Sequence, residues 1–291
     1  MKKLIAILMA LTLLCTSFVS CSGGSSYDDL MILDLGLERE YFGIAFRSGS
    51  DLTRMVEDIT LELINDGTLT DLSAKYEVGA VGKGDYTPKA DPCTGSGDYD
   101  YVKANGKLVI GITDYKPMDY RDDETGEWIG FDADYARAVC AKLGVTAEFK
   151  EIEWEYKLIA LESKDIDCVW NGMTITDAIE AAADCTVPYM YNTQVAVIKK
   201  ADAEKYKTLA DLQGASIAAE GGSAGESVIL SVDALKSGLK SVTAQSDALL
   251  EVLSGTSMFS MLERNASIFS DSCRFASDSS PYKSSSGECL D

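Results

Sequence analysis

The chain has 291 residues, carries a formal net charge of −21 and contains no histidine. Because such an acidic surface repels phosphate backbones, we expect no nucleic-acid partner. The lack of histidine excludes histidine-based metal sites and histidine-dependent acid–base or nucleophilic catalysis. We predict no metal, no cofactor and no catalytic residue. The length is sufficient for two compact lobes, each with its own core.

The N-terminus has the pattern of a secretory signal over residues 1–21. Lys2 and Lys3 precede an apolar run over residues 4–14, which is too short to span a bilayer. Residues 18–21 resemble a bacterial lipobox ending in Cys21, and a Gly/Ser tether follows. We therefore predict an extracytoplasmic protein, anchored to the cell membrane by acyl chains on Cys21. Ordinary cleavage with an incidental cysteine is the alternative.

The next segment predicts two strands, two helices and a linker. Residues 30–35 and 41–46 form short apolar runs that are typical of buried strands. Apolar side chains at helical spacing predict a helix over residues 51–66, and a second helix over 69–76. Residues 77–102 are rich in glycine, proline and polar residues, so we interpret them as a linker.

Strands and helices then alternate. Predicted strands cover residues 107–113, 149–152, 166–170, 194–198, 216–219 and 241–244. Predicted helices cover residues 131–143, 156–163, 209–212, 223–235 and 246–253. This alternation is typical of an α/β fold with mainly parallel sheets. The pattern fails after it, so residues 258–291 are predicted to be a disordered serine-rich tail.

The cysteines do not form any C-x-x-C pair, which argues against zinc ribbons and thioredoxin chemistry. Cys140 falls on the apolar side of a predicted helix and is interpreted as a small core residue. Cys168 and Cys185 could pair in an oxidising compartment, but the sequence does not give their geometry.

Several strings together resemble the amino-acid branch of the bacterial extracellular solute-binding proteins. The matching strings are residues 111–120, 130–134, 167–176, 209–214 and 220–223. The resemblance implies a type 2 periplasmic-binding-protein fold with two lobes, each a mainly parallel sheet flanked by helices. Residues 41–76 resemble the closing strand and last helices of that family, yet here they come first. We therefore expect a circularly permuted or rearranged chain.

The expected organisation combines this resemblance with the element pattern. It comprises a signal peptide (1–21), the family's C-terminal segment within lobe 1 (27–76), a linker (77–102), the rest of lobe 1 (103–192), an incomplete lobe 2 (193–257) and the tail (258–291). Hinge strands are expected near residues 35–41 and 191–198. Lobe 2 is expected to be incomplete because no core strand is recognisable after Thr256.

The resemblance also implies which residues face the ligand. A free amino acid needs donors for its carboxylate, acceptors for its ammonium and a wall for its side chain. Two aromatic walls and a turn after a strand would supply part of this. The residues carried over are Tyr115, Trp154, Asn171, Gly172, Met173 and Thr174.

Two departures from the family pattern concern the charged ends of the ligand. Ile179 stands where the family often has an arginine that binds the carboxylate. No aspartate after Thr256 matches the one that the family uses to bind the ammonium, and Asp114 is a possible substitute. The start of the helix after Gly222, with Ser223 and Ala224, is therefore the leading carboxylate site, since backbone N–H groups there attract anions.

The resemblance implies a monomeric receptor that delivers an amino acid to the membrane subunits of an ABC importer. Residues 221–225 also match the G-x-S-x-G pattern of hydrolases, which we reject because no histidine could activate Ser223. Two alternatives remain open. One is a dehydratase or hydrolase on the same fold, and the other is a rearranged remnant that binds nothing.

Overall fold

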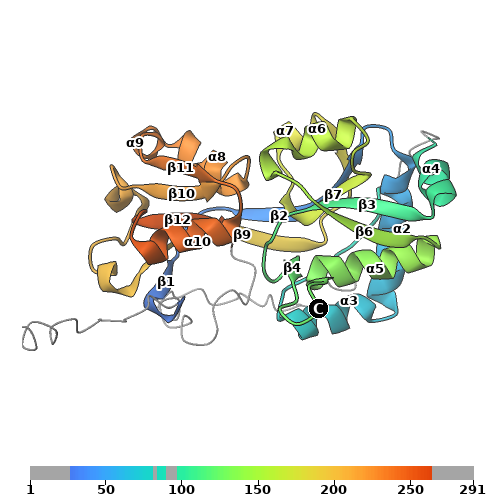
Figure 1. Cartoon of the computed structure of the whole chain (residues 1–291), viewed down its shortest axis with the longest axis horizontal. Helices are drawn as coiled ribbons and strands as arrows, with labels where there is room; N and C mark the ends of the chain where they lie inside the picture. The colour runs from blue at the N-terminus through green and yellow to red at the C-terminus, as the bar shows by residue number, and fades with distance from the viewer. Residues whose placement is uncertain (1–26, 81–83, 90–96, 264–291) are drawn as a thin grey trace, which may run out of the picture.

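The computed structural model describes residues 27–80, 84–89 and 97–263 and shows two α/β lobes joined by two crossing strands, β2 and β9 (Figure 1). Ten strands form one continuous sheet, in the order β11-β10-β12-β9-β2-β7-β3-β6, with β1 added to β9 and β8 added to β2. The predicted two-lobed α/β fold is confirmed. The signal peptide, Cys21 and residues 264–291 of the predicted tail lie outside the described residues.

Lobe 1 holds most of the strands and helices. Its strands are β2 (Arg39–Arg47), β3 (Lys107–Ile112), β4 (Tyr120–Arg121), β5 (Trp128–Ile129), β6 (Thr146–Glu151), β7 (Cys168–Thr174) and β8 (Ala183–Cys185). Its helices are α2 (Asp51–Asn65), α3 (Thr68–Tyr76), α4 (Asp98–Asn105), α5 (Phe131–Leu143), η2 (Trp154–Tyr156), α6 (Lys157–Glu162) and α7 (Asp177–Glu180).

Lobe 2 is smaller, and β9 (Met190–Lys199) runs into it from lobe 1. Its other strands are β1 (Leu30–Leu33), β10 (Ile217–Glu220), β11 (Leu239–Val242) and β12 (Phe259–Glu263). Its helices are η1 (Tyr27–Asp29), η3 (Lys200–Asp202), η4 (Leu209–Leu212), α8 (Ala224–Ser231), α9 (Asp233–Lys236) and α10 (Gln245–Ser254).

The central strands of each lobe are parallel. In lobe 1, β3 pairs in parallel with β6 and β7, and in lobe 2, β10 pairs in parallel with β11 and β12. The crossing strands β2 and β9 pair antiparallel with each other and with their other neighbours. Because parallel strands need helical crossovers, helices cover both faces of each lobe, and the carboxyl ends of the central strands point toward the boundary between the lobes (Figure 1).

The lobe 1 core forms where α2, α3 and α5 cover one face of the sheet. Trp170 on β7 is fully buried there, and its ring meets that of Tyr135 on α5 edge-on, with centroids 4.7 Å apart. On the opposite face, α6 covers a second apolar cluster that includes Leu161 and Ile166. Because helices cover both faces of the sheet here, every residue of β7 is buried, including its polar ones.

The segment that precedes the linker in sequence joins lobe 1 in space. Arg47, at the end of β2, forms ion pairs with Asp98 (3.1 Å) and Asp167 (3.3 Å). Glu57 on α2 accepts hydrogen bonds from the backbone N–H groups of Val187 and Lys89. These contacts place residues 39–76 within lobe 1. The prediction had assigned all of residues 27–76 to that lobe.

The first strand differs from that expectation. β1 pairs with residues 196–199 of β9, and Leu30 is buried in lobe 2 among side chains such as Val197 and Leu262. Because antiparallel pairing to β9 is available only where β9 has entered lobe 2, residues 30–33 belong to that lobe.

Lobe 2 also has the strand that the sequence did not reveal. Residues 259–263 form β12, which lies between β10 and β9, with every residue buried. The prediction of an incomplete lobe 2 and of a tail beginning at residue 258 was therefore wrong. The error arose because Ser257 and Ser260 interrupt the apolar run, and both serines are buried in the folded lobe.

The predicted linker is ordered wherever the structure describes it. Ala80 forms a bridge with Met190, and Tyr86 is buried in lobe 1. The last part of the predicted linker begins α4, whose Val102 is fully buried. These described residues pack against lobe 1, so they belong to that lobe in addition to connecting its two parts in the chain.

Two local predictions also change. The predicted helix over 223–235 is two helices, α8 and α9, separated by Val232, which has extended backbone angles. Cys168 and Cys185 are both buried free thiols, so the possible disulfide between them is not formed.

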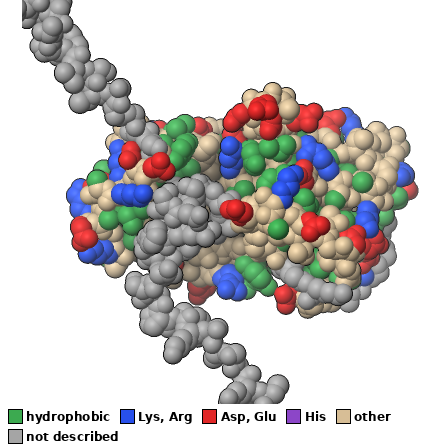
Figure 2. Space-filling view, turned by 90° about the horizontal axis from the view of Figure 1, so that it is seen from below, with side chains coloured by type: hydrophobic (Ala, Val, Ile, Leu, Met, Phe, Trp, Pro, Cys, Tyr) green, Lys and Arg blue, Asp and Glu red, His purple; other side chains and the backbone are tan. Residues whose placement is uncertain are grey.

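Acidic and basic side chains are interspersed over both halves of the face shown in Figure 2.

Candidate functional site

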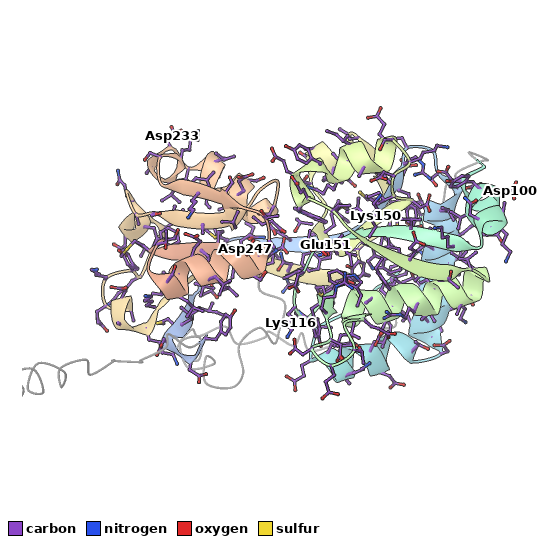
Figure 3. The ribbon with its side chains drawn as sticks, viewed as in Figure 1. Asp100, Lys116, Lys150, Glu151, Asp233 and Asp247 are labelled. Carbon is purple, nitrogen blue, oxygen red and sulfur yellow. The ribbon has the colours of Figure 1, made fainter. Side chains whose placement is uncertain are left out.

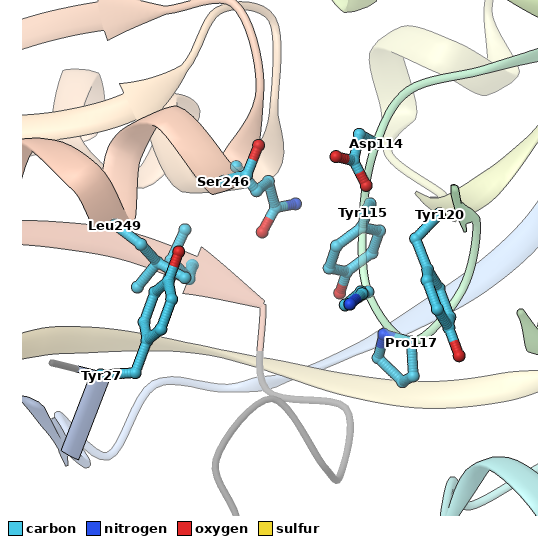
Figure 4. Close-up of a pocket in the computed structure, with 10 residues that line it drawn as sticks. Tyr27, Asp114, Tyr115, Pro117, Tyr120, Ser246 and Leu249 are labelled. Atoms are coloured by element: carbon cyan, nitrogen blue, oxygen red, sulfur yellow. The ribbon is translucent and has the colours of Figure 1, made fainter. Parts of the chain in front are cut away.

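A cleft lies between the lobes, at the carboxyl ends of their central strands. Its open part, here called the mouth pocket, has a volume of about 510 Å³ (Figure 4). The pocket is lined by the loop after β3 in lobe 1, by α10 and β12 in lobe 2, and by Tyr27. Its lining residues are Tyr27, Asp114, Tyr115, Lys116, Pro117, Tyr120, Gln245, Ser246, Leu249 and Leu262.

Behind the mouth pocket, polar side chains from both lobes meet in a cluster, buried except for the partly exposed Glu40, that we call the inner cleft. Its members are Glu40, Tyr115, Lys157, Thr174, Glu220, Gln245 and Glu263. Tyr115 and Gln245 belong to both sets, so the inner cleft and the mouth pocket adjoin. A small solute could therefore place one end among buried polar groups and the other toward the opening.

Glu263, the last residue of β12, connects the two lobes. Its carboxylate accepts hydrogen bonds from Gln245 of lobe 2 (2.9 Å) and from the Thr174 hydroxyl of lobe 1 (3.3 Å). Burial raises the pKa of Glu263 to about 7, and the negative charge of Glu40 adds to the effect. The Tyr115 hydroxyl has no partner of normal hydrogen-bond geometry, but it lies near enough to Glu263 to favour the ionised carboxylate.

Glu220 of lobe 2 and Lys157 of lobe 1 interact electrostatically in the inner cleft. Glu220 ends β10, and burial raises its pKa to about 8, with Glu263 contributing in the same direction. Lys157 begins α6, and burial lowers its pKa to about 8, opposed by the nearby carboxylates of Glu220 and Glu263. The Lys157 ammonium donates to the carbonyl oxygens of Trp154 (3.2 Å) and Gly222 (2.8 Å). An ammonium has three donors, so one N–H remains for a solute.

The predicted residues of the loop after β3 line the cleft. Tyr115 is 2% exposed, and burial raises its pKa well above the usual value. Asp114 is half-buried on the wall of the mouth pocket, and burial raises its pKa. Lys116 and Glu151 of lobe 1 and Asp247 of lobe 2 lie at the facing edges of the lobes and act on Asp114 electrostatically (Figure 3).

Residues 171–174 belong to β7 itself, so the predicted turn after the strand is wrong. The Asn171 side chain accepts a hydrogen bond from the Thr113 N–H, and the Met173 side chain is buried in the lobe 1 core. Thr174 alone among these side chains reaches the inner cleft, where its hydroxyl contacts Glu263 and Glu40. The last residue of β7 therefore brings one of the predicted polar groups into the site.

Gly172 provides close approach, but the group that approaches is Tyr115. Its φ is +56°, and a side-chain carbon added here would lie 2.7 Å from the Tyr115 ring. The Gly172 N–H donates to Asp132 at 2.6 Å. Gly172 therefore supports the aromatic wall from behind.

Trp154 is 6% exposed and packs in the same apolar cluster as Leu161 and Ile166. The Lys157 ammonium lies over its ring, 4.7 Å from the centroid. The face that was predicted to meet a ligand cation is therefore covered by a cation of the chain itself. Trp154 therefore helps to position the Lys157 ammonium.

The predicted carboxylate site at the start of α8 is largely used by the chain. The Gly222 N–H donates to the Glu226 carboxylate at 2.7 Å, and the Ser223 hydroxyl accepts from the Glu226 N–H. Ala224 is the first residue of the helix. Since an acidic side chain already occupies this helix start, Lys157 is the better positioned group for a ligand carboxylate.

Ile179, which replaces the family's arginine, is buried in the lobe 1 apolar cluster. No group at this position can therefore bind an anion. A buried cation near the cleft is instead supplied by Lys157, which was not predicted from the sequence.

Glu40 and Glu263 were not among the residues predicted for the site from the sequence. The signal for Glu263 was present, because a short apolar run over residues 258–262 ends in a carboxylate, as a buried parallel strand leading to a site would. Glu40 instead lies near the start of β2, before its apolar part, and accepts hydrogen bonds from Asn192 and Gln194 of β9.

Residues 108–265 match the model of the bacterial extracellular solute-binding proteins, family 3. The chain belongs to this family. The matched range contains β12, so Glu263 lies within it. Structure and comparison together therefore support the resemblance first indicated by the sequence strings.

Two curated relatives show the extent of the likeness. The chain is 34% identical to the L-cystine-binding protein TcyJ of Escherichia coli (strain K12) over 117 residues, which is 40% of this chain and 44% of the relative. It is 30% identical to the arginine-binding extracellular protein ArtP of Bacillus subtilis (strain 168) over 130 residues, which is 44% of this chain and 49% of ArtP. The chain thus spans about half the length of the curated relatives that it matches.

Solved structures of this solute-binding family superpose on a larger part. The ancestral amino acid-binding protein AncCDT-1, a precursor of cyclohexadienyl dehydratase, matches with a TM-score of 0.54 and 31% identity, covering 57% of this chain and 73% of that one. The arginine-bound form of truncated ArgBP from T. maritima matches with a TM-score of 0.54 and 29% identity, covering 57% and 77%.

Two classes of feature are missing from the part of the chain that the structure describes. None of its helices is long and apolar enough to cross a membrane. Nor do its acidic and cysteine side chains gather into a group that could hold a metal ion.

Proposed function

We propose that this solute-binding protein takes a free amino acid into the inner cleft and delivers it to an ABC importer. The observation that carries the proposal is the contact of Glu263 of lobe 2 with Thr174 of lobe 1, in a buried polar cluster between lobes that two strands connect. Buried polar groups gathered in a cleft between domains are typical of small-molecule sites.

The site offers one partner for each part of a zwitterion. The Glu263 carboxylate accepts from the ammonium of the amino acid. Lys157 donates its remaining N–H to the carboxylate, which is the role the family usually gives to an arginine at the position of Ile179. The Tyr115 ring forms a wall, and the variable side chain extends toward the mouth pocket.

Closure of the lobes about β2 and β9 is the proposed mechanism. The hydrogen bonds from Lys157 to Gly222 and from Thr174 to Glu263 both cross between the lobes, so they form only when the lobes are close. A solute that contacts both lobes stabilises this closed arrangement over an open one, because its affinity differs between them. The closed form is then the one that an importer recognises.

Thermal shift and calorimetric titration with a panel of free amino acids test the proposal. A ligand that binds only the folded chain must raise the melting temperature. Glu263→Gln is expected to abolish the shift, whereas Glu148→Gln, an exposed carboxylate on β6, should leave it unchanged. A panel without any shift in the unmodified chain would contradict amino-acid binding.

Export and lipid anchoring through Cys21 complete the proposal, with the receptor acting as a monomer outside the cytoplasm. Several acyl chains hold a protein stably on a membrane, whereas one holds it weakly. Cys21→Ser is therefore expected to move the protein from the membrane to the soluble fraction. Equal partitioning of the two forms would exclude the anchor.

A second candidate function is acid catalysis on the same fold. It is favoured by the buried pair Glu220 and Glu263, whose pKa values of about 8 and about 7 leave a carboxyl able to give a proton near neutral pH. Turnover distinguishes the two functions, because a receptor returns its bound solute unchanged. The third alternative, a remnant that binds nothing, rested on a strand missing from lobe 2. β12 supplies a strand at that place.

A further inference from the structure

The inner cleft contains more negative than positive groups. Glu40, Glu220 and Glu263 contribute three carboxyl groups, while Lys157 is a buried cation that interacts electrostatically with Glu220 and Glu263. Glu220 is 3% exposed and Glu263 is 6% exposed, so water screens neither well. Buried charges of one sign are unfavourable unless an opposite charge joins them.

The neutral side chains of the cleft add unused acceptors to this negative charge. The amide nitrogen of Gln245 donates to Glu263, and those of Gln194 and Asn192 donate to Glu40. Because each nitrogen is held by a carboxylate, each amide oxygen faces away from it. These three oxygens are buried and have no hydrogen-bond partner in the described part of the chain.

One oxygen of Glu220 is in the same state, buried and without a partner among the described residues. Four unsatisfied acceptors thus lie beside or within a cluster in which carboxyl groups outnumber the cations. Buried acceptors are normally hydrogen-bonded, so their presence together indicates a missing group that is rich in N–H donors. A hydroxyl or amide could satisfy some of them but would not balance the carboxyl groups when they ionise.

We propose that the inner cleft selects amino acids with a cationic side chain, an ammonium or a guanidinium, which Glu220 and the neighbouring amide oxygens bind. This inference rests on the proposed function and specifies its substrate class. Glu263 and Lys157 hold the two charged ends common to all amino acids, which leaves Glu220 for the side chain. The mouth pocket gives a long side chain room to bend.

The charges around Glu220 predict a pH dependence as well. Glu263 on β12, Lys157 on α6 and Asp247 on α10 face Glu220, and the Thr113 hydroxyl also lies close to it. A cation bound beside Glu220 lowers its pKa from about 8, so binding releases a proton at pH 7. Affinity for a cationic solute is therefore expected to rise between pH 6 and pH 9, relative to a neutral solute of the same shape.

The comparison with a neutral solute cancels the other titrating groups. Lys157 loses charge over the same pH range, which weakens its bond to any ligand carboxylate. Glu263 gains charge and strengthens its bond to any ligand ammonium. Both effects act equally on a cationic amino acid and its neutral analogue, so the ratio of their affinities reports on Glu220.

The experiment is calorimetric titration of the whole mature chain with two matched pairs, arginine against citrulline and lysine against norleucine. We expect each cationic member to bind about tenfold to a hundredfold more tightly than its partner. Glu220→Gln keeps the side-chain shape and should reduce the ratio to about one. Asp233→Asn is the matched control, because Asp233 is an exposed lobe 2 carboxylate far from the cleft (Figure 3).

The possible outcomes separate this inference from the function it rests on. Equal or tighter binding of citrulline and norleucine overturns cationic selection while amino-acid binding stands. An unchanged ratio in Glu220→Gln, with the melting temperature of the variant preserved, also overturns it. Failure of every amino acid in the wider panel to bind overturns the proposed function as well. Proton uptake or release, measured in two buffers of different ionisation enthalpy, provides an independent readout.

Discussion

The ammonium of Lys157 in lobe 1 lies 2.8 Å from the carbonyl oxygen of Gly222 in lobe 2. This hydrogen bond links the start of α6 to the loop before α8, so it forms part of the closed arrangement of the lobes. Gly222 has φ of +71°, and a side-chain carbon there would lie 2.8 Å from the backbone of Glu155. Glycine thus permits the close approach that brings its carbonyl to Lys157.

Lys157→Met is expected to weaken amino-acid binding about tenfold to a hundredfold, because it removes the donor proposed for the ligand carboxylate. Because Lys157 also interacts with Glu220 and Glu263, the melting temperature of the variant is measured as well, so that lost affinity is separated from unfolding. Titration of an amino acid against its decarboxylated amine checks this, because only the amino acid should lose affinity. Lys150→Met, an exposed lysine on β6, is the control, and equal losses in the two variants would contradict the assignment.

Trp154→Ala is expected to lower the free energy of unfolding by about 3–5 kcal/mol, the usual cost of removing a large buried aromatic. The physical reason is its place in the lobe 1 apolar cluster. Urea denaturation measures the change, and Tyr156→Ala, whose ring is about half exposed, should cost far less. Unchanged stability with lost affinity would instead make Trp154 a wall of the ligand site, as the family resemblance implies.

Arg47→Met is expected to lower the free energy of unfolding by about 3–5 kcal/mol, because it removes the largely buried guanidinium that pairs with Asp167 and with Asp98, while Asp98 keeps Lys164 at 3.8 Å. The exposed pair of Lys107 and Glu148 provides the comparison. Lys107→Met should cost less than about 1 kcal/mol. If the Arg47 variant unfolds at the same urea concentration as the unmodified chain, β2 does not depend on this contact to stay in lobe 1.

The ligand-free protein is expected to lose stability as pH rises from 5 to 8. Glu220 and Glu263 have pKa values of about 8 and about 7 in the fold, against 4.5 for the unperturbed group. In that window the folded chain keeps protons that the unfolded chain has released, so raising the pH favours unfolding. Lys157, with its pKa lowered to about 8, acts in the opposite sense only above pH 8.

Melting curves between pH 5 and 8 measure this effect. A fall of about 5 °C or more is expected across the window. Glu263→Gln should flatten the slope, because glutamine does not titrate, while Glu148→Gln should not. A melting temperature that stays level in the unmodified chain would show that the two carboxyl groups titrate normally.

Regular elements with strong periodicity could be predicted from the sequence alone. The helix over residues 131–143 agrees at both ends with α5, because Gly130 and Gly144 bound an amphipathic run. β12 could not be predicted so readily, because the buried Ser260 interrupts its short apolar stretch. Serine is tolerated there since the strand is surrounded by other strands and helices, a condition that only the folded lobe creates.

The sequence by itself determined the fold class, the two lobes, and the presence of Tyr115 and Thr174 at the cleft, since these follow from local pattern and from strings shared with a family. Tertiary structure decided which charges meet. Glu40, Lys157, Glu220 and Glu263 are separated by up to 223 positions in the chain, and their effect depends on distance and burial. Because electrostatic interaction energies are set by spatial separation and exposure to water, the acidic balance of the site became visible only once the lobes were brought together.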